Sequence, residues 1–188
     1  MMRRQQAVDI IAAACSVEDI VSVATMQVVP VWHARNTAGQ LHLDALGCMG
    51  SASSLGLGLA LGKPSHKVAV LDGDGSLMMQ LGSLVTIGEL GPSNYFHFVF
   101  ENGTYETSGN QPVPGSSRGS IRDLALGAGY VSAHVFEEAQ AFEAAIGKIF
   151  TGPGPVMSVL RVQREEPTTQ FPKLSMKEQV SVLKQRLG

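Results

Sequence analysis

The sequence predicts an α/β fold with a doubly wound, mainly parallel sheet and helices on both faces. Strand-like apolar segments alternate along the chain with segments whose apolar residues have helical spacing, and this alternation is typical of βα units. Two of the strand segments, 67–72 and 95–100, are mainly apolar, as expected for strands buried on both faces. Asp74 and Asn102, which follow them, are 28 residues apart, and this spacing accommodates one crossover helix between neighbouring parallel strands.

The N-terminal part of the chain begins with apolar residues at helical spacing, which predicts an amphipathic first helix. Pro30 weakens the second helical pattern, because proline disrupts a helix interior. The elements expected here, in the order helix, strand, helix, strand, turn and helix, are 3–15, 19–24, 26–36, 41–44, 47–50 and 51–62.

The rest of the chain continues the alternation and ends in a polar helix. The loop 101–120 is rich in Gly, Pro and Ser, and ordered loops of this length are usually functional. We treat 1–188 as a single domain, with 163–188 as its C-terminal tail and helix. The remaining strands are expected at 67–72, 95–100, 130–135 and 155–162, and the remaining helices at about 77–90, 120–127, 137–149 and 175–187.

The composition fits a compact protein and excludes several function classes. The chain is 44% hydrophobic with a net charge of −2, which provides no electrostatic footprint for nucleic acid. Cys15 and Cys48 lack the spacing of a disulfide framework or an iron–sulfur cluster. We see neither a signal peptide nor a membrane-spanning apolar run, so we expect no membrane association and a cytoplasmic location.

Two short polar stretches indicate a ligand site. Gly73-Asp74-Gly75-Ser76 and Glu101-Asn102-Gly103-Thr104-Tyr105 each follow a predicted strand, and ligands of such sheets bind beyond the carboxyl ends of the strands. The Asp74 carboxylate, the Asn102 amide oxygen and the Thr104 carbonyl are hard donors that suit Mg²⁺ or Ca²⁺. Free N–H groups at the start of the following helix can take a phosphate. The alternative for Asp74 alone is a turn former or helix N-cap, but the pairing with Asn102 favours a magnesium diphosphate site.

The glycine-rich stretch 55–62 is a weaker signal. Its GxGxxxG spacing falls inside a predicted helix, whereas a dinucleotide fingerprint requires a strand-to-helix turn. We expect a helix face of small residues whose backbone closely approaches a neighbouring element or a partner subunit.

In combination, the motifs resemble those of thiamine diphosphate enzymes, and in particular the branch of phosphonopyruvate and sulfopyruvate decarboxylases. The resemblance covers roughly residues 18–162. It rests on Gly47-Cys-Met-Gly-Ser-Ala-Ser-Ser, on Asp72-Gly-Asp-Gly-Ser-Leu-Met-Met-Gln-Leu-Gly, on Asn102-Gly-Thr-Tyr105 and on Ser108-Gly-Asn-Gln-Pro.

The resemblance implies a role for individual residues. Asp74, Asn102 and the Thr104 carbonyl would hold Mg²⁺. Gly47, through its carbonyl, and Met49, as a bulky support that bends the cofactor, would set cofactor conformation and activation and so count as catalytic. The cofactor-binding set is expected to be Gly47, Cys48, Met49, Gly73, Asp74, Gly75, Ser76, Asn102, Thr104 and Tyr105.

The sequence departs from the family pattern in three places and in length. Glu101 stands where Asn is frequent, Asn110 where Gly is, and Cys48 where Ser is, but no metal ligand is lost. A second, pyrimidine-binding domain does not fit in 188 residues. The resemblance therefore implies a separate pyrimidine-binding (alpha) subunit that carries the activating Glu, and a dimer or alpha/beta hetero-oligomer in which this chain is the beta subunit.

The implied function is decarboxylation of a small 2-oxo acid, sulfopyruvate or phosphonopyruvate, with thiamine diphosphate and Mg²⁺. The alternatives are another 2-oxo acid decarboxylase, a carboligase, or a non-catalytic cofactor-binding or interaction module. Candidate proton donors are His33, His42 and His97, the last of which is expected to be structural. Candidate substrate contacts in the long loop are Glu106, Ser108, Asn110, Gln111 and Arg118.

Overall fold

The computed structural model describes residues 1–15, 20–35, 41–173 and 175–188 and contains a six-stranded sheet in which every pairing is parallel. The fold class predicted from the sequence is confirmed. The strand order is β2-β1-β3-β4-β8-β7, so the order reverses between β1 and β3, where open α/β sheets bind their ligands. The strands are β1 Ile20–Thr25, β2 Leu41–Ala45, β3 Lys67–Gly73, β4 Tyr95–Glu101, β7 Ser132–Phe136 and β8 Val156–Arg161.

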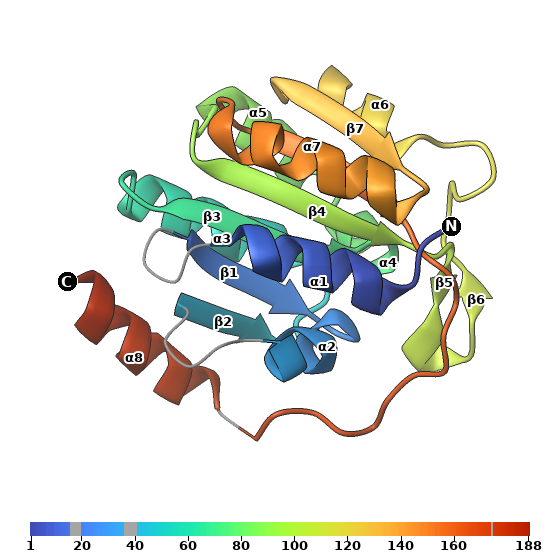
Figure 1. Ribbon diagram of the computed structural model, residues 1–188, viewed down its shortest axis with the longest axis horizontal. Coiled ribbons are helices and arrows are strands. Elements are labelled where there is room, and N and C mark those ends of the chain that lie inside the picture. The colour runs from blue at the N-terminus through green and yellow to red at the C-terminus, as the bar shows by residue number, and fades with distance from the viewer. Residues whose placement is uncertain (16–19, 36–40, 174) are drawn as a thin grey trace.

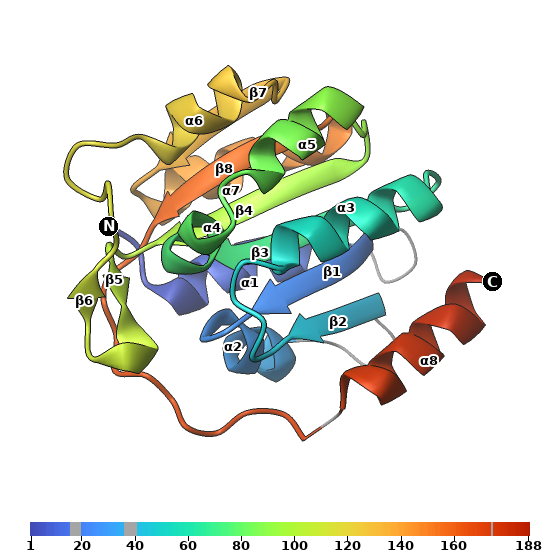
Figure 2. The same cartoon turned by 180° about the vertical axis from the view of Figure 1, so that it is seen from behind.

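Helices cover both faces of this sheet (Figures 1 and 2). One face carries α1 Arg4–Ala14, α2 Val28–Arg35 and α7 Ala139–Thr151, and the other carries α3 Ala52–Gly62, α4 Asp74–Met79, α5 Ser83–Leu90 and α6 Ile121–Gly127. The last helix, α8 Met176–Leu187, lies along the edge strand β2. No helix in the described ranges is long and apolar enough to cross a bilayer.

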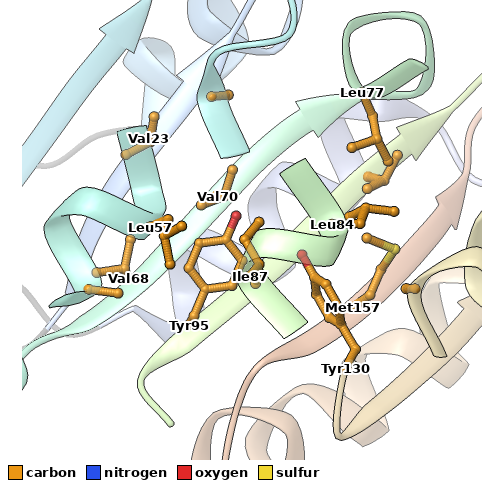
Figure 3. Close-up of a cluster of buried hydrophobic side chains, with 14 of the residues drawn as sticks. Val23, Leu57, Val68, Val70, Leu77, Leu84, Ile87, Tyr95, Tyr130 and Met157 are labelled. Atoms are coloured by element: carbon orange, nitrogen blue, oxygen red, sulfur yellow. The ribbon is translucent and has the colours of Figure 1, made fainter. Parts of the chain in front are cut away.

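The central strands separate two hydrophobic clusters because their side chains alternate between the faces. Val68 and Val70 of β3 join the cluster under α3 and α5, whereas Ala69 and Leu71 join the cluster under α1 and α7. Figure 3 shows the first cluster, in which Tyr95 packs beside Val70. Burial on both faces explains why β3 is mainly apolar rather than alternating.

The prediction of a single helix at about 77–90 is wrong. The chain forms two helices instead, because Gln80 leaves the helical conformation (φ −138°, ψ 45°) and α5 restarts at Ser83. The first of them begins at Asp74, so the aspartate sits in the first turn of α4. The break therefore separates the helix that forms the site from the one that fills the core.

The loop predicted at 101–120 contains a small hairpin. Strands β5 Thr104–Tyr105 and β6 Gln111–Pro112 pair antiparallel around a short 3₁₀ helix, Glu106–Ser108. The tail from 163 to 173 has no regular element, as expected, and α8 begins with a capping box between Ser175 and Glu178.

The helix of small residues is confirmed, and its glycines differ in their surroundings. A Cβ on Gly56 would lie 2.2 Å from Val70 Cγ2, whereas a Cβ on Gly58 would meet nothing within 4 Å. The close approach of α3 to β3 therefore depends on Gly56.

This contrast yields a matched pair of substitutions. Gly56→Ala overpacks the core and should lower the free energy of unfolding by about 1–3 kcal/mol. Gly58→Ala in the same helix should raise it by up to about 1 kcal/mol, because alanine favours helix. Urea denaturation of both variants tests the pair, and equal effects would contradict the packing described here.

Candidate functional site

The Asp74 carboxylate joins the ends of β3 and β4. Its Oδ1 accepts a hydrogen bond from the Gly75 N–H at 2.8 Å, and its Oδ2 accepts one from the Gly103 N–H at 2.7 Å. Asp74 follows β3 and Gly103 lies just beyond β4, so these bonds hold two neighbouring strand ends together. The side chain is buried.

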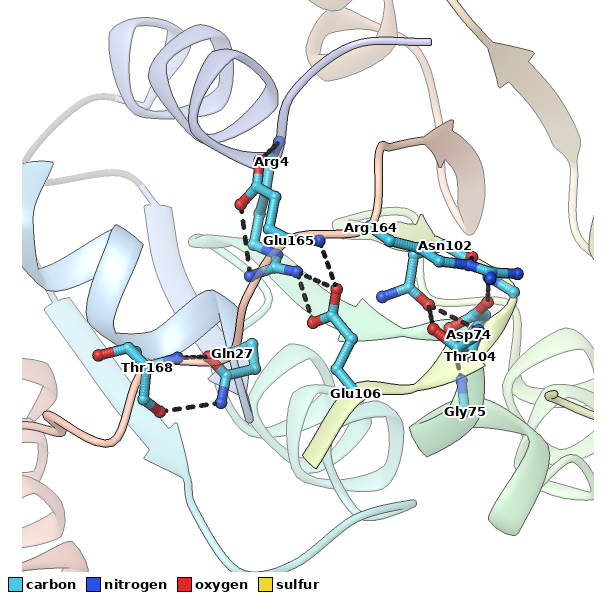
Figure 4. A network of polar contacts seen from close by, with 11 residues as sticks. Arg4, Gln27, Asp74, Gly75, Asn102, Thr104, Glu106, Arg164, Glu165 and Thr168 are labelled. Atoms are coloured by element: carbon cyan, nitrogen blue, oxygen red, sulfur yellow. Dashed lines mark hydrogen bonds and ion pairs between the residues drawn. The ribbon is translucent and has the colours of Figure 1, made fainter. Parts of the chain in front are cut away.

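Asn102 turns its amide oxygen toward the same loop. The Asn102 Oδ1 accepts a hydrogen bond from the Thr104 N–H at 2.8 Å, and Gly103 between them has φ +76°, in the left-handed region that glycine tolerates. Figure 4 shows Asp74, Asn102 and Thr104 gathered at one point. The sequence prediction that Asp74 and Asn102 meet at one edge of the sheet is therefore consistent with the geometry.

The tight turn at 47–50 lies against the start of α4. The Gly50 N–H donates to Ser76 Oγ at 2.9 Å, and Gly47 and Gly50 both have positive φ. Met49 is half-buried and lines the pocket in front of Asp74, whereas Gly47 and Cys48 are exposed. Both cysteines, Cys15 and Cys48, are free.

A pocket opens at the reversal point of the strand order, as the fold predicts. It is lined by residues that follow β1, β3 and β4, together with Met49 and the start of the hairpin. Met26, directly after β1, has φ +47°. A positive φ is uncommon for residues other than glycine and asparagine, and such backbone outliers are often found at functional sites. The lining includes Thr25, Met26, Gln27, Gly73, Asp74, Gly75, Ser76, Asn102, Thr104, Tyr105 and Glu106.

Tyr105 packs directly on the phosphate-binding stretch expected from the sequence. A Cβ on Gly75 would lie 2.6 Å from the Tyr105 ring, so only glycine lets this ring lie over the first turn of α4. The small residue at 75 thus places an aromatic wall beside Asp74.

The lining of the pocket includes a buried ion pair that the sequence did not reveal. The Arg4 guanidinium hydrogen-bonds both oxygens of Glu106, at 2.7 and 2.5 Å, and lies 3.6 Å from Glu165 Oε2. The Arg4 and Glu106 side chains are 5% and 4% exposed. Glu106, a candidate substrate contact, is therefore already paired inside the protein.

The tail after β8 is fastened across the same end of the sheet (Figure 4). Gln27 exchanges two hydrogen bonds with the Thr168 backbone, at 3.0 and 3.2 Å. The Arg164 Nε donates to the Asn102 carbonyl at 3.3 Å. Arg4, Gln27 and the tail were missed because each pairs with a residue far away in sequence, and no local pattern marks them.

The other loop candidates lie away from these contacts. Ser108, Asn110, Gln111 and Arg118 are all exposed, so a ligand or partner could reach them from solvent.

The three candidate histidines lie outside the pocket. His97 is fully buried, 3.4 Å from Asp72 Oδ2 and 3.2 Å from the Tyr130 hydroxyl, which agrees with the structural role expected for it. His33 and His42 lie beside Asp44 at β2 and do not line the pocket.

The residues present fit a divalent cation and a diphosphate. Burial raises the pKa of Asp74 to about 6, although hydrogen bonds from Gly103 and Gly75 act in the opposite direction, and a cation would offset this cost of burying the charge. The carboxylate and amide oxygens of Asp74 and Asn102 are hard donors, which Mg²⁺ prefers. Ser76 and the adjacent backbone N–H groups start a helix, where anions are favoured.

Comparison with known proteins agrees with this geometry. The model of the thiamine pyrophosphate enzyme C-terminal, TPP-binding domain matches residues 21–159. The chain is 48% identical over 84 residues to sulfopyruvate decarboxylase subunit beta of Methanocaldococcus jannaschii, covering 45% of this chain and 44% of that protein. It is 36% identical over 122 residues to phosphonopyruvate decarboxylase of Streptomyces viridochromogenes, covering 65% and 30%. The chain thus spans less than half the length of these curated relatives.

Solved structures share the fold. Benzoylformate decarboxylase from Polynucleobacter necessarius superposes with a TM-score of 0.71 at 19% identity, covering 88% of this chain and 34% of that chain. A putative thiamin diphosphate-dependent enzyme from Mycobacterium smegmatis also reaches a TM-score of 0.71 at 19% identity, covering 87% and 32%.

The buried ion pair generates a prediction about stability. Arg4→Met leaves the Glu106 carboxylate buried without its positively charged partner and should lower the free energy of unfolding by about 3–5 kcal/mol. Arg161→Met removes an arginine that is 46% exposed and pairs with Glu101 and Glu137, and should cost less than about 1 kcal/mol. Chemical denaturation compares the two, and a small effect at Arg4 would show that the pair is not needed for folding.

Proposed function

This chain belongs to the thiamine pyrophosphate enzymes through their C-terminal TPP-binding domain, and we propose that it is the diphosphate- and Mg²⁺-binding subunit of a 2-oxo acid decarboxylase. The observation that carries this proposal is the junction of Asp74 and Gly103, which brings a buried carboxylate and the Asn102 amide oxygen to neighbouring strand ends. In the proposal, Asp74, Asn102 and the Thr104 carbonyl hold Mg²⁺, and Gly75 and Ser76 receive the diphosphate.

When bound, thiamine diphosphate supplies the chemistry by which a 2-oxo acid loses carbon dioxide. The chain's own contribution is orientation. We propose that Gly47 accepts a hydrogen bond from the cofactor at its carbonyl and that Met49 supports the cofactor from within the pocket that it lines. Holding the reacting groups close together is worth a large part of such a rate enhancement.

The proposed substrate is sulfopyruvate or phosphonopyruvate. It is supported by the names of the curated relatives, two of which are sulfopyruvate decarboxylase subunit beta and phosphonopyruvate decarboxylase. Among the described residues that line the pocket, Arg4 is the one basic side chain, and Glu106 and Glu165 already match its charge. We therefore propose that the partner chain supplies the basic side chain that pairs with the sulfonate or phosphonate.

The proposed partner is a pyrimidine-binding chain that carries the activating Glu. Gly47 and Cys48, in the turn assigned to the cofactor, are exposed, so the surface on which the cofactor's other half would lie is open to another polypeptide. The name "subunit beta" of a relative supports a split enzyme of this kind.

The experiment begins with co-purification of the tagged chain from its native cell. The resulting complex is assayed for decarboxylation of sulfopyruvate, phosphonopyruvate and pyruvate. Turnover of a sulfonated or phosphonated 2-oxo acid supports the proposal. Release of carbon dioxide with a 2-hydroxy ketone as product, in place of the aldehyde, would favour a carboligase. A complex that binds cofactor but turns over no 2-oxo acid would favour a non-catalytic module.

Cofactor binding provides a direct mutational prediction. Calorimetry with Mg²⁺ and thiamine diphosphate should show tight binding by the complex and weak or no binding by the lone chain, because the proposal assigns half of the pocket to the partner. In the complex, Asp74→Asn should weaken binding by about 100-fold, since it removes one charge next to the metal.

Asp123→Asn is the matched control, because the Asp123 side chain is 63% exposed on α6. It should bind the cofactor as the unmodified complex does. Equal binding by the Asp74 and Asp123 variants would overturn the assignment of Asp74, and tight binding by the lone chain would overturn the split pocket.

A further inference from the structure

A second polar cluster lies at the edge of the sheet, two strands away from Asp74. The His33 Nε2, on α2, is 2.8 Å from Asp44 Oδ2, and the His42 Nε2 hydrogen-bonds Asp44 Oδ1. One ligand atom from each of the three residues lies within 4.8 Å of the others. The side chains of His33, His42 and Asp44 are 24%, 6% and 1% exposed.

We propose that His33, His42 and Asp44 bind one divalent transition-metal ion, for which Zn²⁺ is the probe. Two imidazole nitrogens and one carboxylate oxygen form a donor set typical of zinc and non-haem iron sites. Hard ions such as Mg²⁺ prefer oxygen ligands and are disfavoured here. The inference is independent of the cofactor site and of the proposed decarboxylation.

Binding of a metal ion requires the three side chains to rotate toward a common point. Metal–ligand bonds of about 2.0–2.2 Å in a tetrahedron place ligand atoms about 3.3 Å apart. The contacts of His33 and His42 with Asp44 would therefore open, and ligand atoms that now lie up to 4.8 Å apart would move closer together through side-chain rotation. Because His33 is partly exposed, water can reach the cluster from solvent and supply a fourth ligand.

Asp44 is oriented by a residue outside the three ligands. Gln179 of α8 donates from Nε2 to Asp44 Oδ2 at 3.1 Å, and its Oε1 accepts the Asp44 N–H at 2.7 Å. In metal sites, residues that hydrogen-bond a ligand side chain without binding the metal fix the orientation of that ligand. Asp44 belongs to the edge strand β2 and Gln179 to α8, which lies beside β2 in Figure 1. A bound ion would therefore hold α2 and β2 together directly, and α8 through Gln179.

The test is titration of the full chain, stripped of metal with EDTA, in the presence of excess Mg²⁺. Calorimetry with Zn²⁺ should show one equivalent, and Co²⁺ should give the visible absorption of a four-coordinate site. His33→Ala and His42→Ala should each weaken binding by about 100-fold or more, and Gln179→Leu by about 10–100-fold.

Two controls should bind Zn²⁺ as the unmodified chain does: His134→Ala, at an exposed histidine, and Asp123→Asn, at an aspartate whose side chain is 63% exposed. Because His42 is largely buried, circular dichroism checks the fold of its variant, and His33→Ala at a partly exposed helix position carries the test if His42→Ala does not fold. Absence of Zn²⁺ binding, or binding equal in the His33 and His134 variants, would overturn the proposal.

Discussion

The hydrogen bond from the Gly103 N–H to the Asp74 carboxylate is the constraint on which the site depends. It joins the ends of β3 and β4, and it forms because these two strands are parallel neighbours in register. The same arrangement buries a carboxylate whose pKa is raised to about 6 by burial. A buried charge of this kind is costly unless an ion or a ligand compensates it, and this supports the proposed binding of a cation.

The rest of the chain is arranged to close the region around that junction. The N-terminal helix supplies Arg4, the hairpin supplies Glu106 and the tail supplies Glu165, so three distant segments meet in one buried ionic group. Met2 also forms an isolated parallel bridge with Val162. The segments that precede β1 and follow β8 thus meet next to Arg4, which lines the pocket. The turn at Gly47 and Cys48 is exposed.

The sequence was sufficient for the features that depend on local pattern. Asp74 and Asn102 could be placed at one edge because each follows an apolar strand, and parallel strands with a single crossover helix end at the same edge. The small residues of 55–62 also predicted a close approach by that helix, but only the structure shows that Gly56 makes it and that β3 is the element approached. The break at Gln80 was not predicted, because the apolar pattern continues through it and only tertiary packing shows that two helices form.

Contacts between residues far apart in the chain could not be predicted from the sequence. Arg4 and Glu106 are 102 positions apart, and nothing near Arg4 distinguishes it from a solvated arginine on an amphipathic helix. The meeting of His33, His42 and Asp44 likewise depends on how α2 packs beside β2. In both cases the chemistry arises from elements that only the fold brings together.

The most direct measurement is the position of the metal ion in a crystal of this chain with its partner and thiamine diphosphate, with Mn²⁺ replacing Mg²⁺. An anomalous difference peak about 2.2 Å from Asp74 and Asn102 oxygens is the predicted result. A peak elsewhere, or a diphosphate bound without these two side chains, would contradict the account.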